Sequence, residues 1–415
     1  MISKNAKFWI WLTQTLGYNT PKVKRLCELY PDISQFCLSD KREWKFCGIL
    51  SDADISKLSS TSFDISQQII DRCDELGYEI LCIDDPKYPK CLYNIDTPPA
   101  VIYISGNLPD VDNRLTIGIV GTRRATKYGL DNSYKIGYAL SKYGVATVSG
   151  GALGIDCASH RGSLAADGVT VCVRGCGINC SYLKENAGMR KAITKRGAVI
   201  SEYPPDEFPR NYYFPARNRI ISALSDGVVI IESGVKSGSL ITASLALEQG
   251  NEVFALLGNN SPQNEGSNNR IKEGTAIPIT DFMDILNAFD NLYATDGEVD
   301  FDNISFEDIE AIPVKGKSPF AKRPKTFVNN NNIPIKKIVD NSDNTKSLKK
   351  HHKKNLNLNI TAQKIYDYIS EEPVHIDKIS SDLQIPVFRV LSSLTELEMK
   401  DLVTALQGRR YVIKK

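Results

Sequence analysis

Three turns rich in glycine and serine carry the residues of this chain that could do chemistry. Each turn follows an apolar stretch and precedes a helical pattern, so its backbone N–H groups would stand free at a helix start. Such groups bind anions, and glycine lets a phosphate come close to them. Because the carboxyl ends of parallel strands meet at one edge of a sheet, the turns together predict a site for a chain of phosphates. The turns are Gly121-Thr122-Arg123-Arg124, Ser149-Gly150-Gly151-Ala152-Leu153-Gly154 and Ser237-Gly238-Ser239-Leu240.

Arginines near these turns extend the predicted anion site. Arg123 could make a paired contact with a phosphate, although a structural arginine bridging to an acidic neighbour is the alternative. Arg217 lies four and seven residues before Ile221 and Leu224, so it begins the helical stripe that faces the sheet. Arg219 would project elsewhere, and a structural role is open for it.

Aromatic residues and a lysine accompany these arginines. The run Asn211-Tyr212-Tyr213-Phe214 places aromatic faces just before Arg217, and Lys184 lies in a second basic segment. Base stacking combined with phosphate contact is the usual way to bind single-stranded nucleic acid. Aromatic residues next to prolines also pack turns, so both roles stay open for each ring taken alone.

Cofactor, metal and catalytic sites fit the residues poorly. The second turn has its glycines at 150, 151 and 154, and the next strand, Val169–Arg174, ends without the ribose-binding acid of the dinucleotide fingerprint. His160 lies beside Ser159, but no serine stands in a nucleophile-elbow pattern. The cysteines between 157 and 180 lack the paired short spacings of a zinc site. We therefore expect no cofactor, metal or catalytic residue, while a tight turn without any ligand stays open for each glycine.

The elements that must position these turns alternate between strand and helix. The strands are apolar throughout, as expected when helices cover both faces of a sheet. Short loops between successive units predict an α/β fold with a Rossmann-like, doubly wound parallel sheet. The expected strands are Ile117–Val120, Val145–Val148, Val169–Val173, Ala198–Ile200, Val228–Ile231 and Val253–Leu257. The glycines expected to end the helices are Gly144, Gly168, Gly197, Gly227 and Gly250.

Three further regions flank this core. Residues 1–75 show apolar positions at helical intervals and predict a small helical domain, joined to the core by two strand-like runs within residues 78–106. Residues 291–358 are too polar to order themselves and predict a linker. Residues 359–415 predict a winged-helix domain. Its expected elements are helices at Ala362–Ser370, Ile376–Leu383 and Val387–Glu398 and a hairpin turning near Gly408.

The partner of the winged helix is open. Phe388, Arg389 and Ser392-Ser393 give its third helix only a thin basic face. Reading of DNA and docking of a protein are both compatible with that face.

Composition narrows the partners and the compartment. The chain has 415 residues, a formal charge of +2 and 42% hydrophobic residues, which is typical of an ordinary soluble protein. Any nucleic-acid binding must therefore come from a local basic cluster. The apolar patch Phe8–Leu12 is too short for a membrane span, and the ten cysteines have no regular spacing. We expect a cytoplasmic protein without membrane contact.

The motifs, taken in order, resemble the DprA/Smf family of DNA-processing proteins. Besides the three turns they include Tyr-Leu-Lys-Glu-Asn, Ser-Glu-Tyr-Pro and Phe-Pro-Ala-Arg-Asn-Arg-Ile-Ile, and the resemblance covers about residues 78–290. It implies a Rossmann-like protein, without enzymatic activity, that binds and protects single-stranded DNA and loads the recombinase RecA during natural transformation. It also implies a homodimer formed around Asp281–Phe289 and a SAM-like or helix-hairpin-helix-like N-terminal domain. The residues and the resemblance together predict these nucleic-acid-binding positions: Arg123, Ser149, Gly150, Gly151, Lys184, Phe214, Arg217, Arg219, Ser237, Gly238 and Ser239.

Some positions depart from the family pattern, and two other classes of function stay open. Leu183 and Leu257 stand where proline is usual, and Arg174 stands where an apolar residue is usual. Related Rossmann-like proteins hydrolyse nucleoside monophosphates, using a glutamate one helical turn after a glycine-rich turn. Thr242 stands at that place here, so the carboxylate that general acid–base catalysis would need at this position is missing. The third class is a scaffold that meets other proteins through its end modules.

Overall fold

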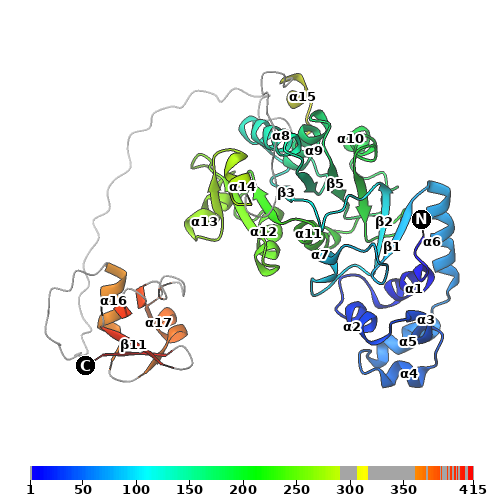
Figure 1. The fold of residues 1–415 in the computed structure, drawn as a ribbon, viewed down its shortest axis with the longest axis horizontal. Helices are drawn as coiled ribbons and strands as arrows, with labels where there is room; N and C mark the ends of the chain where they lie inside the picture. Colours follow the sequence, from blue (N-terminus) through cyan, green and yellow to red (C-terminus); the bar gives the residue numbers. More distant parts are fainter. Residues whose placement is uncertain are drawn as a thin grey trace, which may run out of the picture. The chain divides into compact units, whose positions relative to one another are not determined.

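The structure, a computed structural model, describes most of the chain in two units (Figure 1). The units are Met1–Phe327 and Val328–Lys415, and each is described by itself. The described residues are 2–289, 306–315 and 360–414, the last range without 371–372, 384, 386–389, 391–392, 395–396, 399, 401 and 407–409. No helix within these ranges is long and apolar enough to span a bilayer.

The N-terminal part is helical, which confirms the interpretation of its apolar spacing. Its helices enclose Trp9, Trp11 and Phe36, whose side chains are buried. Ser51 begins one of them with a capping box, because its hydroxyl accepts the N–H of Asp54 while the Asp54 carboxylate accepts the N–H of Ser51. The helices are α1 (Ala6–Leu16), α2 (Lys22–Leu29), α3 (Ile33–Cys37), α4 (Lys41–Phe46), α5 (Asp52–Ser60) and α6 (Asp64–Leu76).

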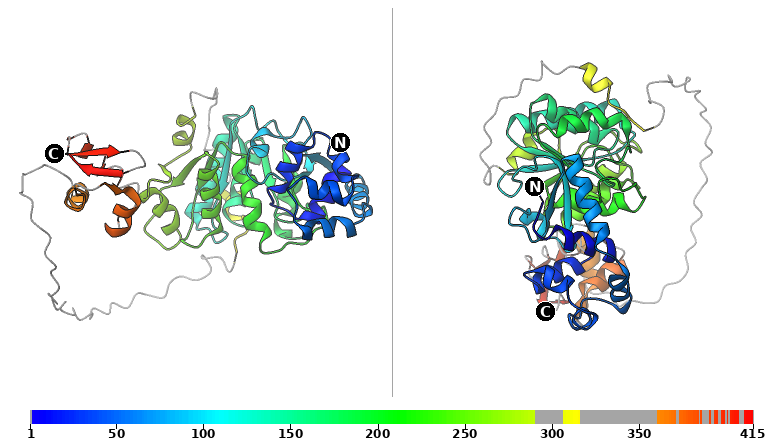
Figure 2. Two further views of the ribbon diagram at one scale, coloured as in Figure 1. Left: turned by 90° about the horizontal axis from the view of Figure 1, so that it is seen from below. Right: turned by 90° about the vertical axis from the view of Figure 1, so that its right-hand side faces the viewer.

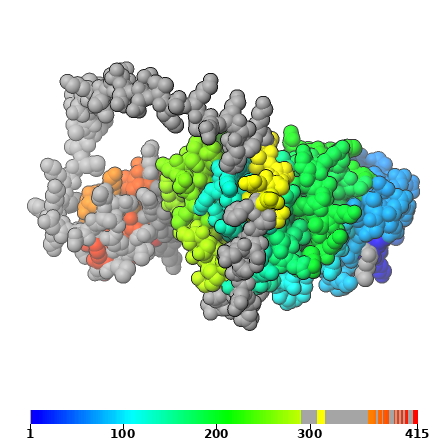
Figure 3. All heavy atoms as spheres, turned by 90° about the horizontal axis from the view of Figure 1, so that it is seen from above, coloured from blue at the N-terminus to red at the C-terminus, as the bar shows by residue number. Residues whose placement is uncertain are grey.

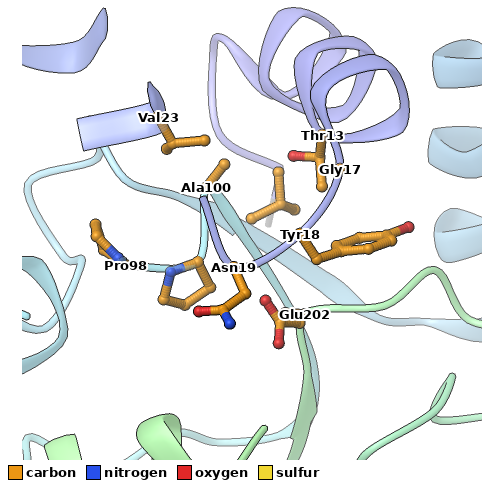
Figure 4. A pocket seen from close by; sticks show the side chains of 10 residues that line it. Thr13, Gly17, Tyr18, Asn19, Val23, Pro98, Ala100 and Glu202 are labelled. Carbon is orange, nitrogen blue, oxygen red and sulfur yellow. The ribbon is translucent and has the colours of Figure 1, made fainter. Parts of the chain in front are cut away.

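The loop after α1 fixes these helices to the core. The Thr97 hydroxyl donates a hydrogen bond of 2.7 Å to the side-chain oxygen of Asn19, and the Tyr18 ring lies 4.8 Å from the ring of Tyr203. A pocket of about 10 Å³ at this contact is lined by Tyr18, Asn19 and Glu202 (Figure 4). We call this contact the N-terminal joint.

The core is a nine-stranded sheet in the order β1-β2-β6-β5-β4-β3-β7-β8-β9. The seven strands from β6 to β9 in that order are parallel, while β2 is antiparallel to β6 and β1 is antiparallel to β2. The doubly wound sheet is therefore confirmed, and β9 is an addition that the sequence analysis missed. The strands are β1 (Glu79–Cys82), β2 (Val101–Gly106), β3 (Thr116–Val120), β4 (Ala146–Ser149), β5 (Thr170–Val173), β6 (Ala198–Ser201), β7 (Gly227–Ile230), β8 (Glu252–Leu256) and β9 (Ile277–Ile279).

Helices cover both faces of this sheet (Figures 1 and 2). The strands feed two apolar layers in alternation: Val228 and Ile230 of β7 pack with α11 and α12, whereas Val229 packs with α8, α9 and α14. Besides α1 to α6, the described helices of this unit are α7 (Lys90–Tyr93), α8 (Lys127–Lys142), α9 (Ile155–Ala165), η1 (Lys184–Asn186), α10 (Ala187–Ile193), α11 (Tyr213–Ala223), α12 (Gly238–Glu248), α13 (Glu265–Lys272), α14 (Met283–Asn287) and α15 (Phe306–Glu310).

The glycines expected to end helices do so in two of the five cases. Gly144 and Gly250 take left-handed φ angles of 76° and 81° after α8 and α12. After α9 the left-handed residue is Asp167 (φ 62°), not Gly168, and Gly227 begins β7. Gly197 has no positive φ; a Cβ there would collide with the Thr170 carbonyl oxygen, so close packing requires this glycine.

The prediction that residues 291–358 form a linker is wrong for residues 306–315. Ile309 and Ile312 are 1% and 5% exposed, and they pack in the apolar layer of α8 and α9. Their spacing of three puts them on one face of a helical turn, a pattern too short to stand out against the polar composition around it. The remainder of the predicted linker, including its basic run, lies outside the described residues.

The C-terminal unit holds a three-stranded antiparallel sheet in the order β10-β12-β11, packed on helices around Ile365, Ile379 and Leu394. The expected hairpin is confirmed as β11–β12, although its turn near Gly408 lies outside the described residues, as do Phe388, Arg389 and Ser392. The described residues of the expected third helix, among them Val390 and Leu397, are helical. The elements are α16 (Ile360–Tyr368), β10 (Val374–His375), α17 (Ile376–Leu383), β11 (Val403–Leu406) and β12 (Arg410–Ile413).

Candidate nucleic-acid interface

A pocket of about 390 Å³ opens at the carboxyl edge of the sheet, beside the point where the strand order reverses. The strands from β3 to β6 run to one side of this point, and β7 to β9 run to the other. Ligands of open α/β sheets bind at such switch points. Six of the predicted binding residues line the pocket: Arg123, Phe214, Arg217, Ser237, Gly238 and Ser239.

Arg123 lines the pocket beside two aromatic rings. Its guanidinium lies 5.4 Å from the centre of the Phe214 ring, and its Nη1 lies 3.5 Å from the Tyr182 hydroxyl oxygen. The rings of Tyr182 and Phe214 lie 5.4 Å apart. No ion pair between described residues involves Arg123. The three side chains, called the Arg123 cluster below, offer a half-buried positive charge on an aromatic platform.

Arg217 lies at the sheet edge as predicted, but much of its hydrogen-bonding capacity is already used. It is 4% exposed, and its Nη1 donates to the carbonyl oxygens of Val173 and, at 3.0 Å, Gly150. Burial lowers the pKa of Arg217, while the nearby Asp156 carboxylate raises it. Because the ordinary pKa of arginine lies far above neutrality, the side chain stays charged.

Asp156 lines the same pocket, and the sequence analysis did not single it out. It is 7% exposed, and its Oδ2 accepts the backbone N–H of Ala152 at 3.3 Å. Burial raises the pKa of this carboxyl group, and Arg217 acts in the opposite direction. Its position in the first turn of α9 was a usable signal, since carboxylates favour helix N-termini.

The second glycine turn is a packed turn rather than an open cradle. Besides the N–H of Ala152, that of Gly154 is taken by the Pro313 carbonyl oxygen at 2.8 Å. Ser149 is buried and donates its hydroxyl to the Ile119 carbonyl oxygen at 2.6 Å. Gly151 has a φ of 64°, and a Cβ there would lie 2.5 Å from the Cys172 sulfur. Ser149 and Gly151 therefore serve the fold, which argues against their prediction as DNA contacts.

Gly150 makes room for two side chains that line the pocket, Arg217 and Asp156. A Cβ there would lie 2.6 Å from Arg217 Nη2 and 2.7 Å from Asp156 Oδ2. The glycine is thus required for the arginine and the carboxylate to approach the turn, and its carbonyl oxygen orients Arg217.

Arg219 has structural contacts, which argue against its prediction as a DNA contact. It is 4% exposed and forms a two-point ion pair with Glu202, with N–O distances of 2.8 and 2.7 Å. Its Nε donates to the Thr97 carbonyl oxygen at 2.8 Å. These contacts lie at the N-terminal joint, away from the pocket, which confirms the open alternative that this arginine projects elsewhere.

Lys184 is exposed at the start of η1 and is not among the residues that line the pocket. Leu183 before it has a φ of 55°, and Arg190 donates to its carbonyl oxygen at 2.9 Å. Proline cannot adopt a positive φ, so this turn takes a conformation of its own that Arg190 holds. Of the other departures, Arg174 is buried and donates to two loop carbonyls, whereas Leu257 is 45% exposed.

The third turn opens onto the pocket at the N-terminus of α12. Ser237 caps the helix, and the Ser239 hydroxyl is shared with those of Ser237 and Ser233 at 2.8 and 2.9 Å. Gly238 is exposed, and a Cβ there would meet nothing within 4 Å. The helix start and Gly238 are therefore the accessible part of this turn.

His160 and Thr242, the two positions considered for catalysis, are both buried. His160 is buried, its Nδ1 lies 2.7 Å from the Thr170 hydroxyl oxygen, and burial lowers its pKa to about 3. Thr242 lines the pocket at the place of the rival enzymes' glutamate. Among the described residues no three His, Cys, Asp or Glu side chains group to hold a metal ion. Lys315, outside the predicted core, also lines the pocket.

A doubly wound sheet with a cation-lined pocket at its switch point defines a Rossmann-like protein with a candidate anion site. The family description "DNA recombination-mediator protein A" matches residues 79–290, and "DprA winged helix domain" matches residues 352–409. The chain belongs to the DprA/Smf family, which confirms the resemblance drawn from the motifs.

Individual relatives agree with this membership. Protein Smf of Synechocystis sp. is 29% identical over 430 residues, which cover 99% of each chain. The DNA processing protein DprA of Streptococcus pneumoniae is 37% identical over 207 residues, covering 50% of this chain and 72% of the relative. An X-ray structure of DprA from Streptococcus pneumoniae superposes with a TM-score of 0.60 at 30% identity, covering 68% of this chain and 97% of that one.

Proposed function

We propose that this protein binds single-stranded DNA across the pocket at the switch point. The observation that carries the proposal is the Arg123 cluster: a cation without an ion-pair partner among the described residues, on an aromatic platform. Phosphates would contact Arg123 and the start of α12, and a base would stack near Phe214. A duplex keeps its base faces stacked inside, so an aromatic platform favours a single strand.

Two further positive charges support a path for the strand across the pocket. Arg217 adds positive charge at the floor of the pocket, and Lys184 adds an exposed charge outside it. Contacts to phosphates and stacked bases read no base edges, so the site would bind DNA of any sequence. The net charge of +2 requires such a local cluster.

The biological role that we propose is that of a DNA-processing protein in recombination. Relatives carry the name DNA processing protein DprA, and the winged-helix domain is shared with the family. On this proposal the protein protects incoming single-stranded DNA in the cytoplasm, loads the recombinase RecA during natural transformation and works as a homodimer joined around Asp281–Phe289. The winged helix would contact DNA or a protein partner.

Fluorescence anisotropy with labelled oligo-dT tests the binding. We expect tight, salt-sensitive binding that weakens about 10- to 100-fold in Arg123→Ala, because a charge-assisted hydrogen bond is worth about 1.5–3 kcal/mol. Lys184→Ala should weaken binding less, since this lysine lies outside the pocket. Arg25→Ala removes an exposed arginine on α2 and serves as the control. Equal oligo-dT affinity in all variants, or a preference for duplex DNA, would contradict the proposal.

Hydrolysis of a nucleoside monophosphate is the second candidate, and Asp156 is the observation in its favour. The carboxyl group lies in the pocket with its pKa raised by burial, which suits a general acid. Its Oδ2 is however engaged by the N–H of Ala152. Incubation with AMP decides between the two: we expect no adenine to be released, and clear turnover would favour the enzyme.

A further inference from the structure

Residues 306–315 fall outside both family matches, which cover 79–290 and 352–409, yet Lys315 at their end lines the pocket. Figure 3 shows this segment in yellow against the surface of the preceding core. Ile309 and Ile312 are buried in the layer of α8 and α9, and Val314 packs against the same layer. We call residues 306–315 the strap.

The strap joins two of the turns at the site through its backbone. The Pro313 carbonyl oxygen accepts the N–H of Gly154 at 2.8 Å, and the N–H of Lys315 donates to the Arg123 carbonyl oxygen at 2.7 Å. The first bond fixes the end of the glycine turn. The second fixes the backbone of the residue whose side chain leads the proposed DNA contact.

The side chain of Lys315 completes the arrangement. Lys315 is exposed, it lines the pocket together with Arg123 and Arg217, and it takes part in no ion pair between described residues. Two acids of the strap act on α8. Burial and, to a smaller degree, Asp308 raise the pKa of Tyr134 to about 12. Burial, together with Glu310, raises the pKa of Asp131. The strap therefore brings a positive charge to the pocket, while Asp308 and Glu310 act on residues of α8.

We propose that the strap is part of the single-stranded DNA site: Lys315 binds a phosphate, and the two backbone bonds hold Arg123 and the glycine turn in place for binding. This inference rests on the proposed function. It adds to the site a cation that neither the glycine turns nor the family match contain.

The charge of Lys315 is tested by the salt dependence of oligo-dT binding. For a single strand each neutralised phosphate contributes about 0.7 to the slope of log K against log salt concentration. Lys315→Gln should lower the steepness of that slope by about 0.7, and the affinity should fall several-fold at low salt. Lys57→Gln, which removes an exposed lysine of α5, should keep the wild-type slope. A wild-type slope in Lys315→Gln overturns the role of the lysine.

The docking of the strap is tested without DNA by amide hydrogen exchange. The double variant Ile309→Asp/Ile312→Asp places two charges in an apolar layer and should release the strap. The N–H groups of Gly154 and Lys315, protected in the wild type, should then exchange faster, and the salt slope should fall as it does in Lys315→Gln. Unchanged protection, or a released strap with a wild-type slope, overturns the inference.

Arg123→Ala measured alongside separates the two proposals. If Arg123→Ala weakens binding while Lys315→Gln and Ile309→Asp/Ile312→Asp do not, the proposed site is supported and the proposed role of the strap is refuted. If the wild type fails to bind oligo-dT, both proposals fall.

Discussion

Helix α11 presents two arginines, Arg217 and Arg219, to different surroundings. Arg217 faces the pocket at the sheet edge, where carbonyl oxygens hold it and Asp156 is its charged neighbour. Arg219 points to the N-terminal joint and is paired at two points with Glu202. Both are 4% exposed, so burial alone does not distinguish them. What differs is the partner: a full ion pair leaves Arg219 nothing to offer a phosphate.

Arg123 differs from both arginines of α11 in its partners. It has no carboxylate partner among the described residues, and a ring rather than an acid supports it. The three arginines predicted for one role thus have different surroundings: Arg219 is ion-paired, Arg217 is held by carbonyl oxygens, and Arg123, which we propose to bind DNA, has no ion-pair partner among the described residues. Substitutions at these positions should therefore change stability, both properties, or binding alone.

The largest effect is expected from Arg219→Ala. The substitution leaves the Glu202 carboxylate buried without a partner, which costs about 3–5 kcal/mol of the free energy of unfolding. Urea denaturation followed by circular dichroism measures this loss. Oligo-dT affinity of the folded variant should stay at the wild-type value, because Arg219 lies away from the pocket.

The variant Arg219→Ala/Glu202→Gln is the matched control. It removes the unpaired charge, so part of the lost stability should return. Normal stability combined with weak DNA binding in Arg219→Ala would show that Arg219 contacts DNA, and it would contradict the distinction drawn between Arg219 and Arg217.

Arg217→Ala should lower both properties. The carbonyl oxygens of Gly150 and Val173 lose their donor, at a cost of about 1–3 kcal/mol for each acceptor left without a partner. Oligo-dT affinity should fall as well. Arg217 lowers the pKa of Asp156, so that pKa should rise further in the variant, and binding should recover as the pH falls and the carboxylate takes up a proton.

Arg217→Lys separates the two effects of this substitution, since it keeps the charge without the two-point geometry. We expect most of the stability loss and only part of the binding loss. A variant that loses binding at full stability would place Arg217 with Arg123 instead.

The positions of the pocket residues could be predicted from the sequence. Whether their polar groups are free to contact a ligand could not. Apolar strands and the glycine turns are local signals, and they predicted the doubly wound sheet and the edge at which Arg123, Phe214 and Ser237 meet. The spacing from Arg217 to Ile221 predicted the face of α11. These inferences depend only on the periods of helices and strands.

Availability depends on partners far away in the chain. The Gly154 N–H is bonded by Pro313, and Arg219 is paired with Glu202, and neither pairing has a local signature. The strap was missed because its few apolar residues, among them Ile309 and Ile312, stand in a longer polar segment, and only the structure shows that they pack on α8 and α9. Such partners become visible only when the tertiary contacts are known.

The smallest effect is expected from Phe214→Leu, which keeps an apolar side chain beside Gly175 but removes the aromatic face. Loss of stacking should cost about 1 kcal/mol, the low end of the range for one base, or about fivefold in oligo-dT affinity. An abasic oligonucleotide of the same length presents phosphates without bases. Its affinity should hardly change, because Arg123 keeps its charge.

Phe208→Leu is the matched control, since Phe208 is 77% exposed and is not among the residues that line the pocket. It should leave both affinities unchanged. If Phe214→Leu weakened the abasic strand as much as oligo-dT, the ring would act by supporting the Arg123 guanidinium rather than by stacking on a base. The Arg123 cluster would then be a phosphate site alone, and the preference for a single strand would have to come from another part of the groove.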